Sequence, residues 1–212
     1  MSNENAPRLL VTGFEPFPGA PVNPTERLVA RLRAEAPAGE GIAAFRADIL
    51  PVDFDAVGPR LSAIGRDFAP DIALHFGLAT ECAGFRLERI ARNRFEADRP
   101  DNSGVLREGG AVCAGPDIIA SRLPLDAIAS RLAAAGLPVE WSNDAGGYLC
   151  NTVMTLSLAH ACEDFAPAVS GFMHVPLTGA KPDFAMTDDD LFEGALIAIR
   201  ACVDQWAAAP AT

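Results

Sequence analysis

Short apolar runs alternate along the chain with segments of helical periodicity. The apolar runs predict strands over residues 8–12, 42–50, 71–76, 85–91, 139–142 and 170–174. Apolar residues three and four apart predict helices from about residue 24, over 54–68 with an interruption near Pro59, and over 125–135, 149–160 and 187–208. Strands interleaved with helices favour a sheet covered on both faces. We therefore predict an α/β fold, a single-domain three-layer α/β/α sandwich with a mixed, mostly parallel sheet.

Two segments interrupt this alternation. Residues 14–24 carry four prolines, which no regular element accommodates. Residues 98–118 are rich in glycine and proline and predict a long functional loop or a small hairpin. No repeat or linker divides the chain, so we predict one domain over residues 1–212, with a polar tail at 1–7. Thr187 and Asp190 have the spacing of a capping box.

The composition is globular and acidic. Half of the 212 residues are hydrophobic, and 17 Lys and Arg against 28 Asp and Glu give a net charge of −11. That sign disfavours nucleic acid and anionic membranes as partners. No apolar run reaches the ~18 residues of a membrane span, and the start of the chain lacks the pattern of a secretory signal. We expect a freely soluble cytoplasmic protein, with its oligomeric state, including a homo-oligomer, left open.

The five cysteines have wide, irregular spacing, at positions 82, 113, 150, 162 and 202. This spacing resembles neither a disulfide framework nor a metal site, so we expect reduced thiols, most of them small core residues, and no metal. Cys150 differs because it begins a predicted helix after a glycine turn. The positive end of a helix favours the nucleophilic thiolate. Simple filling of a tight strand-to-helix junction is the alternative.

Three histidines are candidates for the base that such a thiol needs. His174 stands at the end of an apolar strand, where ligands of α/β sheets bind. His75 lies within an apolar strand and is expected to be a packed residue. His160 closes the helix that begins near Cys150, where a cation suits the helix dipole.

Glu88 is a carboxylate in an otherwise apolar strand, which is costly unless the charge is paired. A salt bridge with Arg86 or Arg92 would satisfy it. The alternative is a third catalytic member that orients a histidine and stabilises its imidazolium. Spacing alone leaves both open.

Four segments, in order from about residue 9 to 176, resemble the pyroglutamyl-peptidase I family of cysteine exopeptidases, which remove an N-terminal pyroglutamate. They are VTGFEPFPGAPVNP, LERIARN followed by RPDNSG, DAGGYLCN, and GFMHVP. The resemblance implies that Cys150 is the nucleophile, His174 the general base and acid, and Glu88 the partner that orients the histidine. It also implies an α/β/α sandwich, a small peptide substrate and no metal or organic cofactor.

The resemblance further implies that Phe14 and Phe17 line a flat pocket for the lactam ring, with Asn23 near it. Ordinary core packing is the alternative for the two phenylalanines. Leu78 stands where the family usually has glutamine, which removes a polar group from this pocket. The family's glycine-rich segment that follows is replaced by ATECAG, residues 79–84.

One further departure concerns a charge. The family's arginine before its Asp-Asn pair aligns with Asp98, although Arg99 is adjacent. Three functions follow from these patterns. The first is cleavage of pyroglutamate from peptides, the second is hydrolysis of another small N-acyl or cyclic amide by the same three residues, and the third is a catalytically silent binding or assembly role.

Overall fold

A six-stranded sheet forms the centre of the computed structural model, which describes residues 6–37 and 41–209. Most of the predicted tail at 1–7 lies outside the described residues. The strands stand in the order β2-β1-β3-β8-β4-β7. Their bounds are β1 Arg8–Phe14, β2 Ala44–Leu50, β3 Ile72–Leu78, β4 Phe85–Glu88, β7 Val139–Ser142 and β8 Val169–Val175. Neighbouring strands are parallel except β4 and β8, which are antiparallel.

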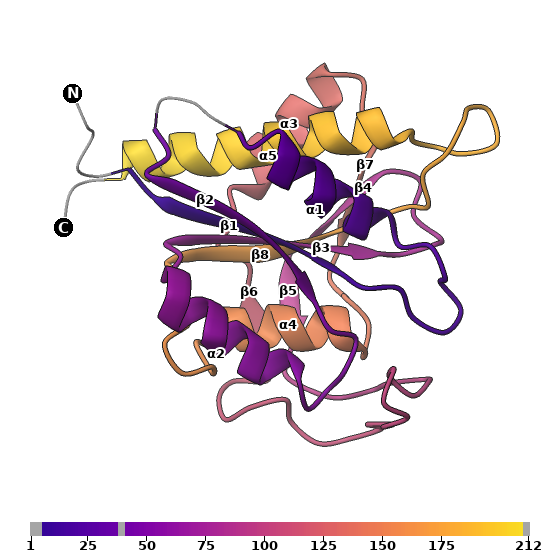
Figure 1. Cartoon of the computed structure of the whole chain (residues 1–212), viewed down its shortest axis with the longest axis vertical. Coiled ribbons are helices and arrows are strands. Elements are labelled where there is room, and N and C mark those ends of the chain that lie inside the picture. The colour runs from indigo at the N-terminus through magenta and orange to yellow at the C-terminus, as the bar shows by residue number, and fades with distance from the viewer. Residues whose placement is uncertain (1–5, 38–40, 210–212) are drawn as a thin grey trace.

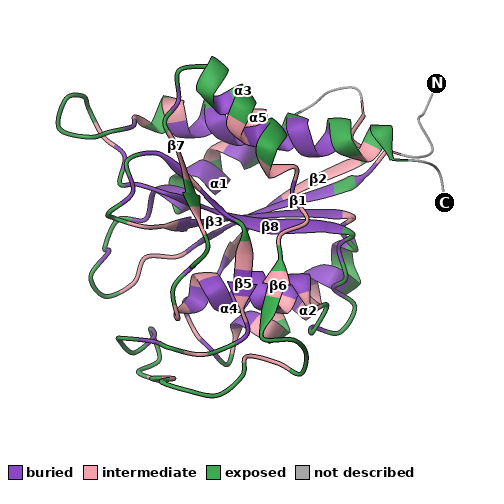
Figure 2. Cartoon of the chain, turned by 180° about the vertical axis from the view of Figure 1, so that it is seen from behind, coloured by how far each residue is buried: buried purple, intermediate pink, exposed green. Residues whose placement is uncertain are grey.

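Helices cover both faces of the sheet (Figure 1). One face carries α1 (Pro24–Ala34), α3 (Leu125–Ala134) and α5 (Asp188–Ala208), and the other carries α2 (Val57–Phe68) and α4 (Leu149–Leu158). Each helix layer encloses its own apolar core against the sheet. The central strands β3 and β8 are therefore buried on both sides, as Figure 2 shows. The predicted three-layer α/β/α fold is confirmed.

The single strand predicted over 85–91 is wrong, because the chain changes sheet at Arg89. β4 ends at Glu88, and β5 (Ile90–Arg92) pairs with β6 (Ile118–Ala120) in a separate two-stranded sheet. The N–H of Arg89 donates to the Ser142 carbonyl, and the Arg89 carbonyl accepts from the N–H of Ser121. The long loop predicted over 98–118 is present up to β6.

The predicted break of the helix near Pro59 is also wrong. α2 begins at Val57, so Pro59 is its third residue. The N–H groups of a first turn have no partner within the helix, and proline is tolerated there. The capping box of Thr187 and Asp190 is confirmed. The other predicted elements are present, with ends that shift by one or two residues.

α4 ends at Leu158, and Arg122 supplies the cation that we expected from His160 at this end. The Arg122 Nη1 donates to the Leu158 carbonyl over 2.9 Å. His160 lies beyond the helix end and its Nε2 is 2.7 Å from Arg122 Nη2. Within residues 6–37 and 41–209, no helix is both long and apolar enough to cross a membrane.

Candidate active site

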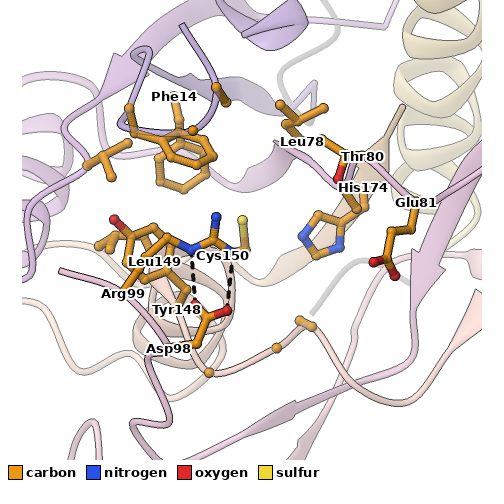
Figure 3. A pocket seen from close by; sticks show the side chains of 18 of the residues that line it. Phe14, Leu78, Thr80, Glu81, Asp98, Arg99, Tyr148, Leu149, Cys150 and His174 are labelled. Carbon is orange, nitrogen blue, oxygen red and sulfur yellow. Dashed lines mark hydrogen bonds and ion pairs between the residues drawn. The ribbon is translucent and has the colours of Figure 1, made fainter. Parts of the chain in front are cut away.

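A cavity of about 500 Å³ opens beyond the carboxyl ends of β1, β3 and β8 (Figure 3). Six of the residues singled out from the sequence line it, namely Phe14, Phe17, Asn23, Leu78, Cys150 and His174. The seventh, Glu88, lies behind His174. The structure therefore brings these side chains together, although they come from five separate segments.

Strand alternation brings Glu88 and His174 to one face. Arg86 is paired with His174 across the antiparallel β4–β8 register, so Glu88, two residues on, lies diagonally opposite the histidine. The His174 Nδ1 donates to Glu88 Oε1 over 2.8 Å. Glu88 is fully buried and His174 is 6% exposed, so the histidine is a core residue although it stands near the end of its strand.

The salt-bridge alternative for Glu88 is wrong, because both arginines bind other groups. Arg86 Nε donates to Glu140 Oε2 over 3.0 Å, and Arg92 pairs with Asp144 at 3.4 Å. The second oxygen of Glu88, Oε2, is buried and has no hydrogen-bond partner among the described residues. His174 is thus the group that stabilises this buried carboxylate.

The surroundings of His174 favour its charged form. Burial by itself lowers the pKa of the imidazole, but the charge and hydrogen bond of Cys150 and the hydrogen bond and charge of Glu88 outweigh it and raise the pKa to about 9. Nδ1 is engaged by Glu88, so Nε2 is the nitrogen left to face the thiol. The hydrogen bond to Glu88 thereby fixes the orientation of the imidazole.

Cys150 is the second residue of α4, in its first turn as predicted. The thiol lies against Gly77 of β3, where a β-carbon would come within 2.7 Å of Cys150 Sγ and 2.6 Å of the Phe172 ring. Gly77 is also paired with His174 in the β3–β8 register. The missing side chain of Gly77 therefore makes the space in which the thiol meets the histidine.

The other four cysteines are poor nucleophiles by comparison. Burial raises the pKa of the Cys82 and Cys162 thiols to about 11 and that of Cys202 to about 12, and it also raises the pKa of Cys113. All five cysteines are free thiols. Cys82, Cys162 and Cys202 are buried, which confirms the expected role of most cysteines as small core residues.

Aromatic rings form one wall of the cavity. Phe14 packs against Phe172 at 6.3 Å between ring centroids, and Phe17 packs against Tyr148 at 6.1 Å. Asn23 is the N-cap of α1: its Oδ1 accepts from the N–H of Thr25 at 3.1 Å, and its Nδ2 donates to the Glu15 carbonyl at 3.2 Å. Asn23 therefore holds the loop that carries Phe17.

Asp98 and Arg99 both line the cavity and bind each other, with Nε of Arg99 2.9 Å from Asp98 Oδ1. The guanidinium of Arg99 lies 5.6 Å from the centre of the Tyr148 ring and 6.0 Å from that of Phe17. Figure 3 shows it extending across the cavity beside Cys150. Arg99, rather than Asp98, thus places a positive charge at the aromatic wall.

His75 is the packed strand residue that we predicted. It is fully buried, and its ring nitrogens contact the Thr12 hydroxyl at 2.7 Å and the Ser157 hydroxyl at 3.1 Å. Burial lowers the pKa of this histidine to about 3. It does not line the cavity that holds Cys150 and His174.

Sequence reasoning gave no role to Gly77 under the thiol, nor to two residues that line the cavity, Tyr148 in the aromatic wall and Glu81. Gly77 is adjacent to Leu78 and Tyr148 is two residues before Cys150, both positions that we did single out. Glu81 is further from either. The signal for Glu81 was present in the ATECAG segment, where a charged residue replaces a glycine-rich stretch.

A thiol at a helix N-terminus, with an imidazole beside it and a carboxylate behind the imidazole, is the side-chain set of a cysteine hydrolase. Residues 7–205 match the family profile described as pyroglutamyl peptidase. The chain belongs to this family, and the predicted enzyme class, a cysteine-type peptidase, is confirmed.

Relatives and solved structures agree. The chain is 42% identical over 170 residues to the pyrrolidone-carboxylate peptidase of Pyrococcus furiosus, covering 80% of each chain. It is 35% identical to that of Oceanobacillus iheyensis, covering 85% of this chain and 92% of the relative. A crystal structure of the Thermus thermophilus pyrrolidone carboxyl peptidase superposes with a TM-score of 0.80 at 32% identity, covering 91% of this chain and 99% of that one.

Proposed function

We propose that this protein hydrolyses the amide bond after an N-terminal pyroglutamyl residue, with Cys150 as nucleophile, His174 as acid and base, and Glu88 as the partner that orients His174. The observation that carries the proposal is the hydrogen bond of 2.8 Å between His174 Nδ1 and Glu88 Oε1, directly behind a cavity that also holds Cys150. Family membership supplies the substrate class.

The reaction follows from these positions. The raised pKa of His174 favours an imidazolium beside the Cys150 sulfur at neutral pH. The thiolate attacks the pyroglutamyl carbonyl carbon, and the positive end of α4 stabilises the negative oxygen that forms. His174 then gives its Nε2 proton to the leaving amine, the carbon–nitrogen bond breaks, and a thioester remains. His174 next takes a proton from water as the water attacks the thioester, which frees pyroglutamate and the thiolate.

The lactam ring fits the aromatic wall of Phe14 and Phe17, which bind a flat ring through apolar contact. Its N–H and carbonyl need polar partners, because an unpaired buried group costs ~1–3 kcal/mol. Leu78 offers none, and Asn23 is bound to Thr25 and Glu15. We therefore infer that backbone groups read the lactam and that discrimination against less polar rings such as proline is weak.

The test is release of a fluorophore from pyroglutamyl and prolyl amides by the wild-type protein and by Cys150→Ser. We expect turnover of the pyroglutamyl amide by the wild type and at least a hundredfold loss in Cys150→Ser, with Cys202→Ser as the matched control that keeps activity. Iodoacetamide should label Cys150 before the other four cysteines. Alkylation of Cys150 without pyroglutamyl turnover would favour the alternative of another N-acyl or cyclic amide substrate.

We also propose the reducing interior of the cell as the location of the enzyme. A thiolate nucleophile and five free cysteines are compatible with that compartment, whereas oxidising compartments favour disulfides.

A further inference from the structure

The proposed function leaves open which peptides are cleaved fastest, and the charges around the cavity bear on this. We propose that Glu81 is a specificity residue that favours peptides with a lysine or arginine directly after the pyroglutamyl residue. The inference rests on the proposed function and names the preferred substrates of the same site.

Glu81 lies on the side of the cavity that receives the leaving group. It belongs to the turn between β3 and β4 and lines the cavity with Thr80. Figure 3 shows both beside His174, across the cavity from Phe14. The pyroglutamyl ring is proposed to bind at Phe14, and His174 protonates the leaving amine. We therefore expect the residue after the cleaved bond on the side of His174, where Glu81 also lines the cavity.

The charge of Glu81 is not neutralised by an arginine, unlike the other carboxylates that line the cavity. Asp98 pairs with Arg99 at 2.9 Å, Glu96 with Arg94 at 2.7 Å and Asp144 with Arg92 at 3.4 Å. Glu81 is exposed and has no ion pair or hydrogen bond among the described residues. A cationic side chain of the substrate would supply its first partner.

The neighbouring cation does not fill this role. Arg86 is paired with His174 in the strand register and lines the same cavity, but its Nε is bound to Glu140 Oε2 at 3.0 Å. The other oxygen of Glu140 accepts from the N–H of Ala83 at 2.8 Å. Arg86 is thus engaged by a carboxylate that also fixes the turn carrying Glu81.

The turn holds Glu81 in place relative to His174. The N–H of Ala79 donates to the Val175 carbonyl at 3.0 Å, next to His174, and the N–H of Cys82 donates to the Ala79 carbonyl at 3.1 Å. The backbone on both sides of Glu81 is therefore bonded to the end of β8 and to itself. A charge on such a turn is a defined part of the site.

An exposed charge pair changes binding modestly, and we expect about twofold to fivefold in kcat/KM. The effect should shrink with added salt, because ions screen exposed charges beyond about one Debye length. The experiment measures kcat/KM for three pyroglutamyl peptides that differ only in the second residue, which is lysine, norleucine or glutamate. Norleucine keeps the length of the lysine stem without its charge.

The same measurements are made on Glu81→Gln and on Glu163→Gln, which removes an equal charge from an exposed position outside the cavity. We expect the wild type and Glu163→Gln to rank lysine above norleucine above glutamate, and Glu81→Gln to cleave the three peptides at similar rates. The inference is overturned if the wild type cleaves the three peptides at similar rates, or if Glu81→Gln keeps the wild-type ranking. In either case the hydrolysis itself still supports the proposed function. If none of the three peptides is cleaved, the proposed function fails and the inference fails with it.

Discussion

His75 and His174 lie on neighbouring strands, and both are buried and contact α4. Their pKa values are nevertheless shifted in opposite directions. His75 reaches Ser157 of α4 and His174 reaches Cys150. The pKa of His75 falls to about 3, and that of His174 rises to about 9. Burial, which acts on both, therefore does not account for the difference between the two histidines.

The partners of the two rings make the difference. His75 is bound by the hydroxyls of Thr12 and Ser157, and Ser157 in turn contacts Ser170 over 2.6 Å. Hydroxyl groups satisfy the ring nitrogens but carry no charge to offset the cost of burying an imidazolium. Cys150 and Glu88 together carry that charge for His174. The charged neighbours of a buried histidine therefore decide whether it can hold a proton at neutral pH.

The largest effect should come from His174→Ala. Removing the group that delivers a proton to the leaving amine is expected to lower kcat by about 10²–10⁴. The assay is fluorophore release from a pyroglutamyl amide, with far-UV circular dichroism to establish that the variant is folded. A kcat within a few-fold of the wild type would remove His174 from the mechanism and with it the contrast between the two histidines.

A smaller loss is expected in Glu88→Gln. Glutamine keeps an oxygen that can accept from Nδ1 of His174 but lacks the charge that stabilises the imidazolium. We expect kcat to fall by about tenfold to a hundredfold and the pKa of His174 to fall from its raised value. NMR titration of the imidazole and the pH dependence of Cys150 alkylation measure this. An unchanged pKa would show that Cys150 alone accounts for the shift.

The smallest effect on turnover should come from His75→Phe, which keeps an aromatic ring and removes two hydrogen bonds. Leaving the buried Thr12 hydroxyl without its partner should lower the free energy of unfolding by about 1–3 kcal/mol at pH 7, measured by urea denaturation. We expect kcat to stay within a few-fold of the wild type. A loss comparable to that of His174→Ala would make His75 part of the reaction.

The two histidines also predict opposite limbs of a pH–stability curve. The lowered pKa of His75 means that the unfolded chain binds a proton that the folded chain lacks, so its contribution is present above pH 6.5 and is lost as the pH falls towards about 3. The raised pKa of His174 gives stability below pH 6.5 that is lost as the pH rises through about 9. His75→Phe should flatten the acid limb alone.

The periodicity of apolar residues was sufficient to predict most of the fold, and in β4 it also separates the two faces of the strand. In β4, Phe85 and Leu87 alternate with Arg86 and Glu88, and this alternation already separates the apolar face from the face that carries the carboxylate. The partner of Glu88 could not be predicted from the sequence, because Arg86 and Arg92 were both plausible ion-pair partners by position. The structure shows that Glu140 binds Arg86 and that Asp144 binds Arg92.

The strand break at Arg89 likewise could not be predicted from the residues around it. β5 exists because β6 pairs with it from about thirty residues further along, and no composition within 85–91 marks that pairing. The role of Asn23, by contrast, could have been predicted from the sequence. Asparagine directly before a proline and a threonine is a typical N-cap pattern, but the family resemblance led us to place Asn23 near the pocket instead.

Gly77 has a consequence for what can be attached to the sulfur. Bare backbone closes one side of Cys150 Sγ, and a β-carbon there would already overlap it. The sulfur is therefore closed on this side, and the side open to reagents is the one that faces the cavity, which Cys150 lines. Any acyl or alkyl group bonded to it must leave along that one direction, and electrophiles must arrive along it. Reagents branched at the reacting carbon should be excluded while slender ones enter, so the sheet itself acts as a steric filter on covalent inhibitors.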